Sequence, residues 1–81
     1  MTVRVLAFAR LRELLGASET PIVLNDGATV GTAWKALAER VPALAPLASS
    51  TRTACNGTLV PGDRVLLDGD ELALLPPVGG G

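Results

Sequence analysis

The sequence contains no histidine, no tyrosine and a single cysteine, so it lacks most of the side chains on which enzymes rely. Without histidine there is no Ser-His-Asp triad, no Cys-His pair and no imidazole ligand for a metal ion. The glycines form neither a P-loop nor a dinucleotide-binding pattern. We therefore expect no bound cofactor, no metal site and no catalysis by this chain on its own.

The lone cysteine, Cys55, cannot form a disulfide within the chain, and this is typical of proteins in the reducing cytoplasm. It lies in an apolar segment with no adjacent base, so we interpret it as a small core residue rather than a reactive thiol. Residues 1–8 alternate in polarity and do not resemble a signal peptide. Both observations favour a cytoplasmic location.

Aromatic and basic residues are also few. Phe8 and Trp34 are the two aromatic residues, and the seven basic residues are scattered along a chain of net charge -1. Such a pattern lacks the basic patch and stacking aromatics of a nucleic-acid-binding protein. The longest apolar stretches are far shorter than the ~20 residues of a membrane-spanning helix. We expect neither a nucleic-acid partner nor a membrane.

The 81 residues that are present, 48% of them hydrophobic, are sufficient for one small domain. Polarity patterns and turn signals predict strands at residues 3–8, 21–24, 51–55, 58–60 and 71–75, a short helical turn at 10–15 and an extended stretch at 64–67. Asn56-Gly57 is a strong signal for a hairpin turn between two of these strands.

One long helix is predicted between Thr29, a plausible N-cap, and Pro42, which a helix cannot pass. Four apolar residues recur at helical spacing and predict the buried face of this helix: Val30, Trp34, Leu37 and Val41. The order of strand, strand, helix and further short strands predicts an α+β roll of the β-grasp type over residues 1–75. Its mixed sheet would be covered on one face by the main helix, with the first and last strands able to pair in parallel.

The last six residues differ from the rest, and we expect residues 76–81 to form a flexible tail. Pro76 and Pro77 extend the backbone and cannot continue a sheet ladder. Val78 and three glycines follow, Gly79, Gly80 and Gly81, which have no Cβ and leave the terminal carboxylate unhindered. A frayed end is the simpler interpretation. The combination favours delivery of the C-terminus into the active site of another protein.

Three segments resemble a known family. Residues 8–16 resemble the Phe-Ala-x-x-Arg-Glu-Leu-x-Gly opening of the small subunits of molybdopterin synthase, the MoaD family of ThiS/MoaD ubiquitin-like sulfur carriers. Residues 56–60 and 68–72 resemble its hairpin and its Asp-Gly-Asp-Glu turn. Residues 74–81 resemble its ending of two apolar residues, Pro-Pro-Val, a variable residue and Gly-Gly, although Leu74 and Leu75 replace common aromatic residues.

This resemblance implies a β-grasp fold and a chemical role for Gly81 alone. A ubiquitin-activating-like adenylyltransferase would use ATP to adenylate its carboxylate, and a sulfur donor protein would convert the adenylate to a thiocarboxylate. The tail, Pro76 to Gly80, would insert into the large catalytic subunit of the synthase. There the sulfur would be donated to the cyclic pyranopterin precursor to form the molybdopterin dithiolene.

Both faces of the first and last strands are apolar, although one helix can cover only one face. We therefore predict that Phe8, Leu59 and Leu75 form a patch that docks on partner proteins. The alternative is that the connector around Leu44 and Leu47 folds over these residues as a second core.

Three acidic residues flank a glycine near the last strand: Asp68, Asp70 and Glu71. Their spacing is not that of a calcium loop, and we expect them to face water.

Three other functions share the same tail. A sulfur carrier for thiazole or cysteine synthesis would use the same chemistry with a different partner. A ubiquitin-like protein modifier would form isopeptide bonds with lysines. An interaction module would not need the glycines at all.

Overall fold

The structure is a computed structural model and describes residues 1–76. Its elements follow in the order β1 (Thr2–Ala7), α1 (Ala9–Leu15), β2 (Glu19–Val23), α2 (Val30–Arg40), η1 (Pro42–Ser50), β3 (Arg52–Cys55), β4 (Thr58–Val60) and β5 (Glu71–Leu75). Each predicted strand and helix is present, with ends that differ from the prediction by one or two residues.

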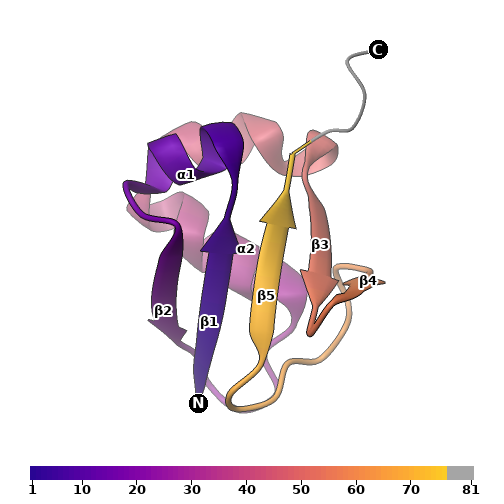
Figure 1. Cartoon of the computed structure of the whole chain (residues 1–81). Coiled ribbons are helices and arrows are strands. Elements are labelled where there is room, and N and C mark those ends of the chain that lie inside the picture. Colours follow the sequence, from indigo (N-terminus) through magenta and orange to yellow (C-terminus); the bar gives the residue numbers. More distant parts are fainter. Residues whose placement is uncertain (77–81) are drawn as a thin grey trace.

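The five strands form one mixed sheet in the order β2-β1-β5-β3-β4. β1 and β5 pair in parallel at its centre, with Val5 beside Leu72, and the other neighbours are antiparallel. α2 crosses one face of the sheet, while the strands lie in front of it in Figure 1. This arrangement confirms the predicted α+β, β-grasp fold.

The main helix begins where the sequence predicts. The Thr29 hydroxyl accepts a hydrogen bond from the Thr32 N–H at 3.2 Å, and the Thr32 hydroxyl accepts one from the Thr29 N–H at 3.2 Å. This capping box satisfies two amide groups that the first helical turn leaves unpaired. α2 then ends at Arg40, two residues before Pro42.

The buried face of α2 consists of Val30, Ala33 and Leu37, so the prediction is confirmed for Val30 and Leu37 but not for Trp34 and Val41. Trp34 is half-buried at the margin of the core, so its assignment as a core residue is wrong. Ala33 is fully buried against the core, whereas the indole of Trp34 lines a groove at the edge of the domain. Val41, also predicted to be buried, is half-buried just beyond the helix.

The core lies between this helix and the inward-facing residues of the central strands. Val3 and Val5 of β1 and Leu72 and Leu74 of β5 are at most 1% exposed. Leu44, in the 3-10 helix η1, is fully buried in the same core. The connector therefore covers the helical face of the sheet, and it does not form the second core that was the alternative to a docking patch.

In the acidic turn before β5, Asp68 is exposed as expected and Glu71 is partly exposed, but Asp70 is buried. Asp70 is 7% exposed, and its carboxylate accepts hydrogen bonds from the Asn56 side-chain amide at 2.9 Å and the Leu67 N–H at 2.8 Å. Asp68 accepts a hydrogen bond from the Thr2 N–H at 2.7 Å. The hydrogen bond from the Leu67 N–H, and to a smaller extent the one from the Asn56 amide, hold the pKa of Asp70 below its usual value, because both bonds favour the charged form.

Asn56 connects this carboxylate to the hairpin turn between β3 and β4. Its φ of 50° and the 87° of Gly57 match the turn that favours Asn-Gly in tight hairpins. Its side-chain oxygen also accepts a hydrogen bond from the Glu71 N–H at 3.0 Å. Two turns that are distant in sequence are thereby fixed to each other at the beginning of β5.

Cys55, the residue before this turn, is 2% exposed and belongs to the core, as predicted. Burial raises the pKa of its thiol above the usual value, and the adjacent Asp70 carboxylate acts in the same direction.

We predict that Asp70→Asn destabilises the fold by roughly 1–3 kcal/mol at about pH 7. An amide side chain has only one acceptor oxygen, so its NH2 group would face either the Leu67 N–H or the Asn56 amide, which are both donors. The depressed pKa of Asp70 means that its carboxylate stabilises the native state above the unfolded pKa of about 3.9. That contribution is lost as the pH falls through the folded pKa. Urea unfolding should therefore show that the difference between wild type and variant shrinks at about pH 3.

Asp63→Asn is the matched control, because Asp63 is an exposed acid in a neighbouring turn. Equal stability of wild type and Asp70→Asn at neutral pH would contradict the role assigned to this carboxylate.

Candidate functional site

The chain leaves the domain from the centre of the sheet. β5 lies between β1 and β3 and ends at Leu75, and Pro76 follows as a half-buried residue. Pro76 borders a cavity of about 290 Å³ whose other lining residues come from α1, η1 and the residue after η1. Five residues predicted to form the tail and its reactive end lie outside the described residues: Pro77, Val78, Gly79, Gly80 and Gly81.

Phe8 and Leu75 lie beside this exit, on the face of the sheet opposite α2, called the outer face below. Ala7 pairs with Leu74 across β1 and β5, so the next residues along the two parallel strands are also neighbours. The Phe8 side chain is 46% exposed and Leu75 is half-buried. In antiparallel register, Arg52 of β3 pairs with Leu75 on its other side. Phe8, Leu75 and Arg52 form a row that we call the exit row.

Leu59, the third predicted patch residue, lies in the adjacent row rather than against Leu75. The register places four residues side by side across four strands, and we call them the apolar row: Leu6, Ala73, Ala54 and Leu59. Leu59 is 57% exposed at the sheet edge. The structure thus brings Phe8 and Leu75 together, and it connects Leu59 to them through two small alanines.

Sequence reasoning missed Leu6, Ala54 and Ala73 as parts of this surface. Alternation within each strand shows that both faces are apolar, but it does not show which residues of different strands are neighbours. That information comes from the register of the central pair.

The backbone turns sharply where β1 ends. Phe8 is extended at φ -127° and ψ 154°, whereas Ala9 has a φ of 51°. The left-handed region costs a residue with a Cβ roughly 1–2 kcal/mol. This turn separates the exposed Phe8 from Leu11, which α1 buries in the core.

A cluster of three charged residues lies beside the apolar row, on the side away from the exit row. Arg4 pairs with Glu71 in the register of β1 and β5, and its guanidinium contacts Glu71 at 2.8 Å and Glu19 at 2.9 Å. All three side chains are well exposed to water, so each ion pair contributes at most about 1 kcal/mol. The pairs neutralise Arg4 and leave the neighbouring row apolar.

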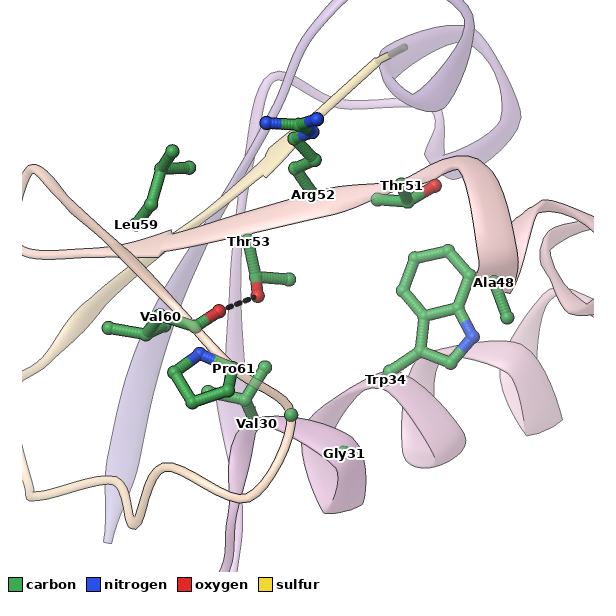
Figure 2. A pocket seen from close by; sticks show the side chains of 11 residues that line it. Val30, Gly31, Trp34, Ala48, Thr51, Arg52, Thr53, Leu59, Val60 and Pro61 are labelled. Atoms are coloured by element: carbon green, nitrogen blue, oxygen red, sulfur yellow. Dashed lines mark hydrogen bonds between the residues drawn. The ribbon is translucent and has the colours of Figure 1, made fainter.

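The β3–β4 hairpin also borders an open groove of about 470 Å³, whose lining includes Leu59 and Arg52 as well as Trp34 and Thr53 (Figure 2). Figure 2 shows Leu59 and Arg52 on one side of the hairpin, and Trp34 with Thr53 on the other. The Thr53 hydroxyl donates a hydrogen bond to the Val60 carbonyl at 3.0 Å, which fixes one wall of the groove. Trp34 forms part of the opposite wall, which explains its half-buried position.

Within residues 1–76, no group of three histidine, cysteine or acidic side chains could hold a metal ion. No helix in that part of the chain is long and apolar enough to cross a membrane. The described site therefore consists of an exit for the C-terminus and an uncovered apolar surface beside it. Such an arrangement can bind a protein and present a chain end.

Comparison with known proteins gives the same picture over the whole chain. Residues 5–81 match the model of the ThiS family. A molybdopterin synthase sulfur carrier subunit from Escherichia coli is 41% identical over 98% of this chain and 99% of its own length.

Solved structures with the same fold are also similar in sequence. SAMP1 from Haloferax volcanii, a small archaeal modifier protein, has a TM-score of 0.87 and 31% identity, with both chains covered completely. A chain in the complex of subunits 1 and 2 of the molybdopterin-converting factor from Helicobacter pylori has a TM-score of 0.70 and 28% identity, again over both chains completely. Together with the match over residues 5–81, these similarities show that the chain belongs to the ThiS family.

Proposed function

We propose that this protein is the sulfur carrier and small subunit of a molybdopterin synthase, with the carboxylate of Gly81 as its working group. One observation carries the proposal: the C-terminal strand lies at the centre of the sheet and ends beside an uncovered apolar surface. A partner that binds this surface would receive the tail at the same time. The description of the Escherichia coli relative and the two-subunit complex from Helicobacter pylori support the same function.

The proposed chemistry requires activation by another enzyme. A terminal carboxylate with a pKa of about 3.3–3.7 is ionised at neutral pH and is a poor electrophile. In the proposed cycle, its oxygen attacks the α-phosphate of ATP on an adenylyltransferase, and pyrophosphate leaves. Sulfide (HS⁻) delivered by a donor protein then attacks the carbonyl carbon and displaces AMP, and loss of the sulfur's proton gives the thiocarboxylate.

The large catalytic subunit would receive this thiocarboxylate and supply the acids and bases for the reaction. The sulfur would attack the cyclic pyranopterin precursor, and water would then release the tail as a carboxylate. Two such transfers build the dithiolene of molybdopterin. This chain would bind no cofactor and would not catalyse a reaction alone, and the buried free thiol of Cys55 fits the cytoplasm as its location.

The proposed cycle predicts a change in the mass of the intact protein. After incubation with the adenylyltransferase, ATP and a sulfur donor, the mass should rise by the difference between one sulfur and one oxygen. Deleting Gly80 and Gly81 should abolish the rise, and so should adding one alanine after Gly81, which keeps every native residue. An unchanged mass with an enzyme that modifies another carrier would contradict the proposal.

If Phe8, Leu59 and Leu75 form a partner interface, a charge placed among them should weaken binding. Leu75→Asp should weaken binding to the large synthase subunit at least about tenfold, because a charge replaces a buried apolar contact. Val23→Asp is the matched control, since Val23 is 81% exposed on the outer face of the edge strand β2. Calorimetry would measure both affinities.

Leu59→Asp provides a second test at a more exposed position that tolerates a charge in the free protein. Wild-type affinity for both folded variants would remove the patch from the interface.

A second candidate function is protein modification, which the similarity to SAMP1 favours. A modifier would form an amide between its terminal carbonyl and a lysine of another protein. Expression of a tagged chain in its host should then give bands of higher mass that disappear when Gly80 and Gly81 are deleted. A sulfur carrier without this activity would give the thiocarboxylate and no such bands.

A further inference from the structure

Charge is distributed unevenly along the sheet. Three carboxylates lie in turns near the end where β1 begins: Asp26, Asp68 and Asp70. Three basic side chains belong to elements at the opposite end, where the chain leaves the domain: Arg10, Arg12 and Arg52. Glu13 is the one carboxylate on α1. The elements beside the exit, α1 and β3, thus carry three basic side chains and one carboxylate.

Two of these basic residues flank the exit. Arg52 pairs with Leu75 in the register of β3 and β5, and it completes the exit row on one side. Arg10 lines the cavity that Pro76 borders on the other side. Figure 2 shows the Arg52 side chain on the Leu59 side of the hairpin, away from Trp34. Two exposed arginines therefore flank the end of β5: Arg52 beside Leu75, and Arg10 in the lining of the cavity that Pro76 borders.

The exit arginines differ from the third arginine near this surface. Arg4, on the outer face, is held by two carboxylates at 2.9 and 2.8 Å. Within residues 1–76, neither Arg10 nor Arg52 forms an ion pair with a carboxylate. The chain neutralises the arginine that is farther from the exit and leaves positive charge beside it.

We propose that Arg10 and Arg52 are the charged half of the docking surface and that the partner presents carboxylates around the opening that receives the tail. This inference rests on the proposed carrier function and adds the chemistry of its partner. Apolar contacts of Phe8, Leu59 and Leu75 hold the complex but have little directionality. Opposite charges at the opening orient the encounter and raise the association rate before those contacts form.

A protein partner fits these residues better than a nucleic acid. The arginines border an apolar surface, and the chain as a whole carries a net charge of -1. A phosphate backbone would require a longer basic track.

Stopped-flow association with the large subunit of molybdopterin synthase tests the inference. Arg52→Glu and Arg10→Glu should each lower the association rate constant about tenfold at about 50 mM salt. The difference from wild type should largely disappear at about 0.5 M salt, where screening shortens the range of the charges. Lys35→Glu is the matched control, since it makes the same charge change on the exposed side of α2 and should alter the rate less than about twofold.

The outcomes separate this inference from the carrier function. If the wild-type chain acquires the thiocarboxylate mass but Arg10→Glu and Arg52→Glu associate as fast as the wild type, the charge assignment is wrong and the carrier function stands. An equal loss of rate for Lys35→Glu would also overturn it, because net charge alone would then explain the effect. A wild-type chain that neither gains the mass nor binds the large subunit would overturn both. Circular dichroism of each variant verifies that it is folded.

Discussion

The parallel pairing of the first and last strands is the constraint on which the rest of this structure depends. Because β1 and β5 lie side by side, the strand that carries the C-terminus occupies the centre of the sheet and is bonded on both sides. Parallel neighbours require a long connection, and here it contains both the main helix and the β3–β4 hairpin. The C-terminal strand is consequently held by a neighbour on each side.

One-sided covering of the sheet follows from the same chain path. α2 and η1 both pack on the inner face, and Leu44 fills the core between them. The outer face keeps its apolar residues without a covering element, and only the Arg4 ion pairs and Arg52 add charge to the central strands. Among the described residues no element covers that face, and an exposed apolar surface of this kind is typical of a site that binds another protein.

Local signals were sufficient to predict much of this fold. Thr29 and Pro42 marked the helix, Asn56-Gly57 marked the hairpin, and the element order gave the β-grasp topology. The errors concern one helix face and one turn. Trp34 was misplaced because one residue of helical rotation separates core from edge. Asp70 was misplaced because its carboxylate accepts hydrogen bonds from Asn56, in a turn distant in sequence, and from the Leu67 N–H in its own turn.

The candidate site shows the same division. The sequence alone was sufficient to predict Phe8, Leu59 and Leu75 as residues of the patch. Each is apolar and belongs to a predicted strand whose opposite face is also apolar. The register places Arg52 beside Leu75, and it places two alanines between Leu75 and Leu59. It depends on which strands pair, so no single segment of the sequence predicts it. The position of Arg52 beside the exit is therefore visible only in the assembled sheet.

The central position of β5 also has a mechanical consequence. A partner that draws the C-terminus into a narrow site pulls along the axis of this strand. The ladders to β1 and β3 run perpendicular to that axis, so their hydrogen bonds resist the pull together, in shear, instead of opening one after another. The Asn56–Asp70 bond anchors the far end of the same strand. The domain can thus bear tension on its tail without unravelling from that end.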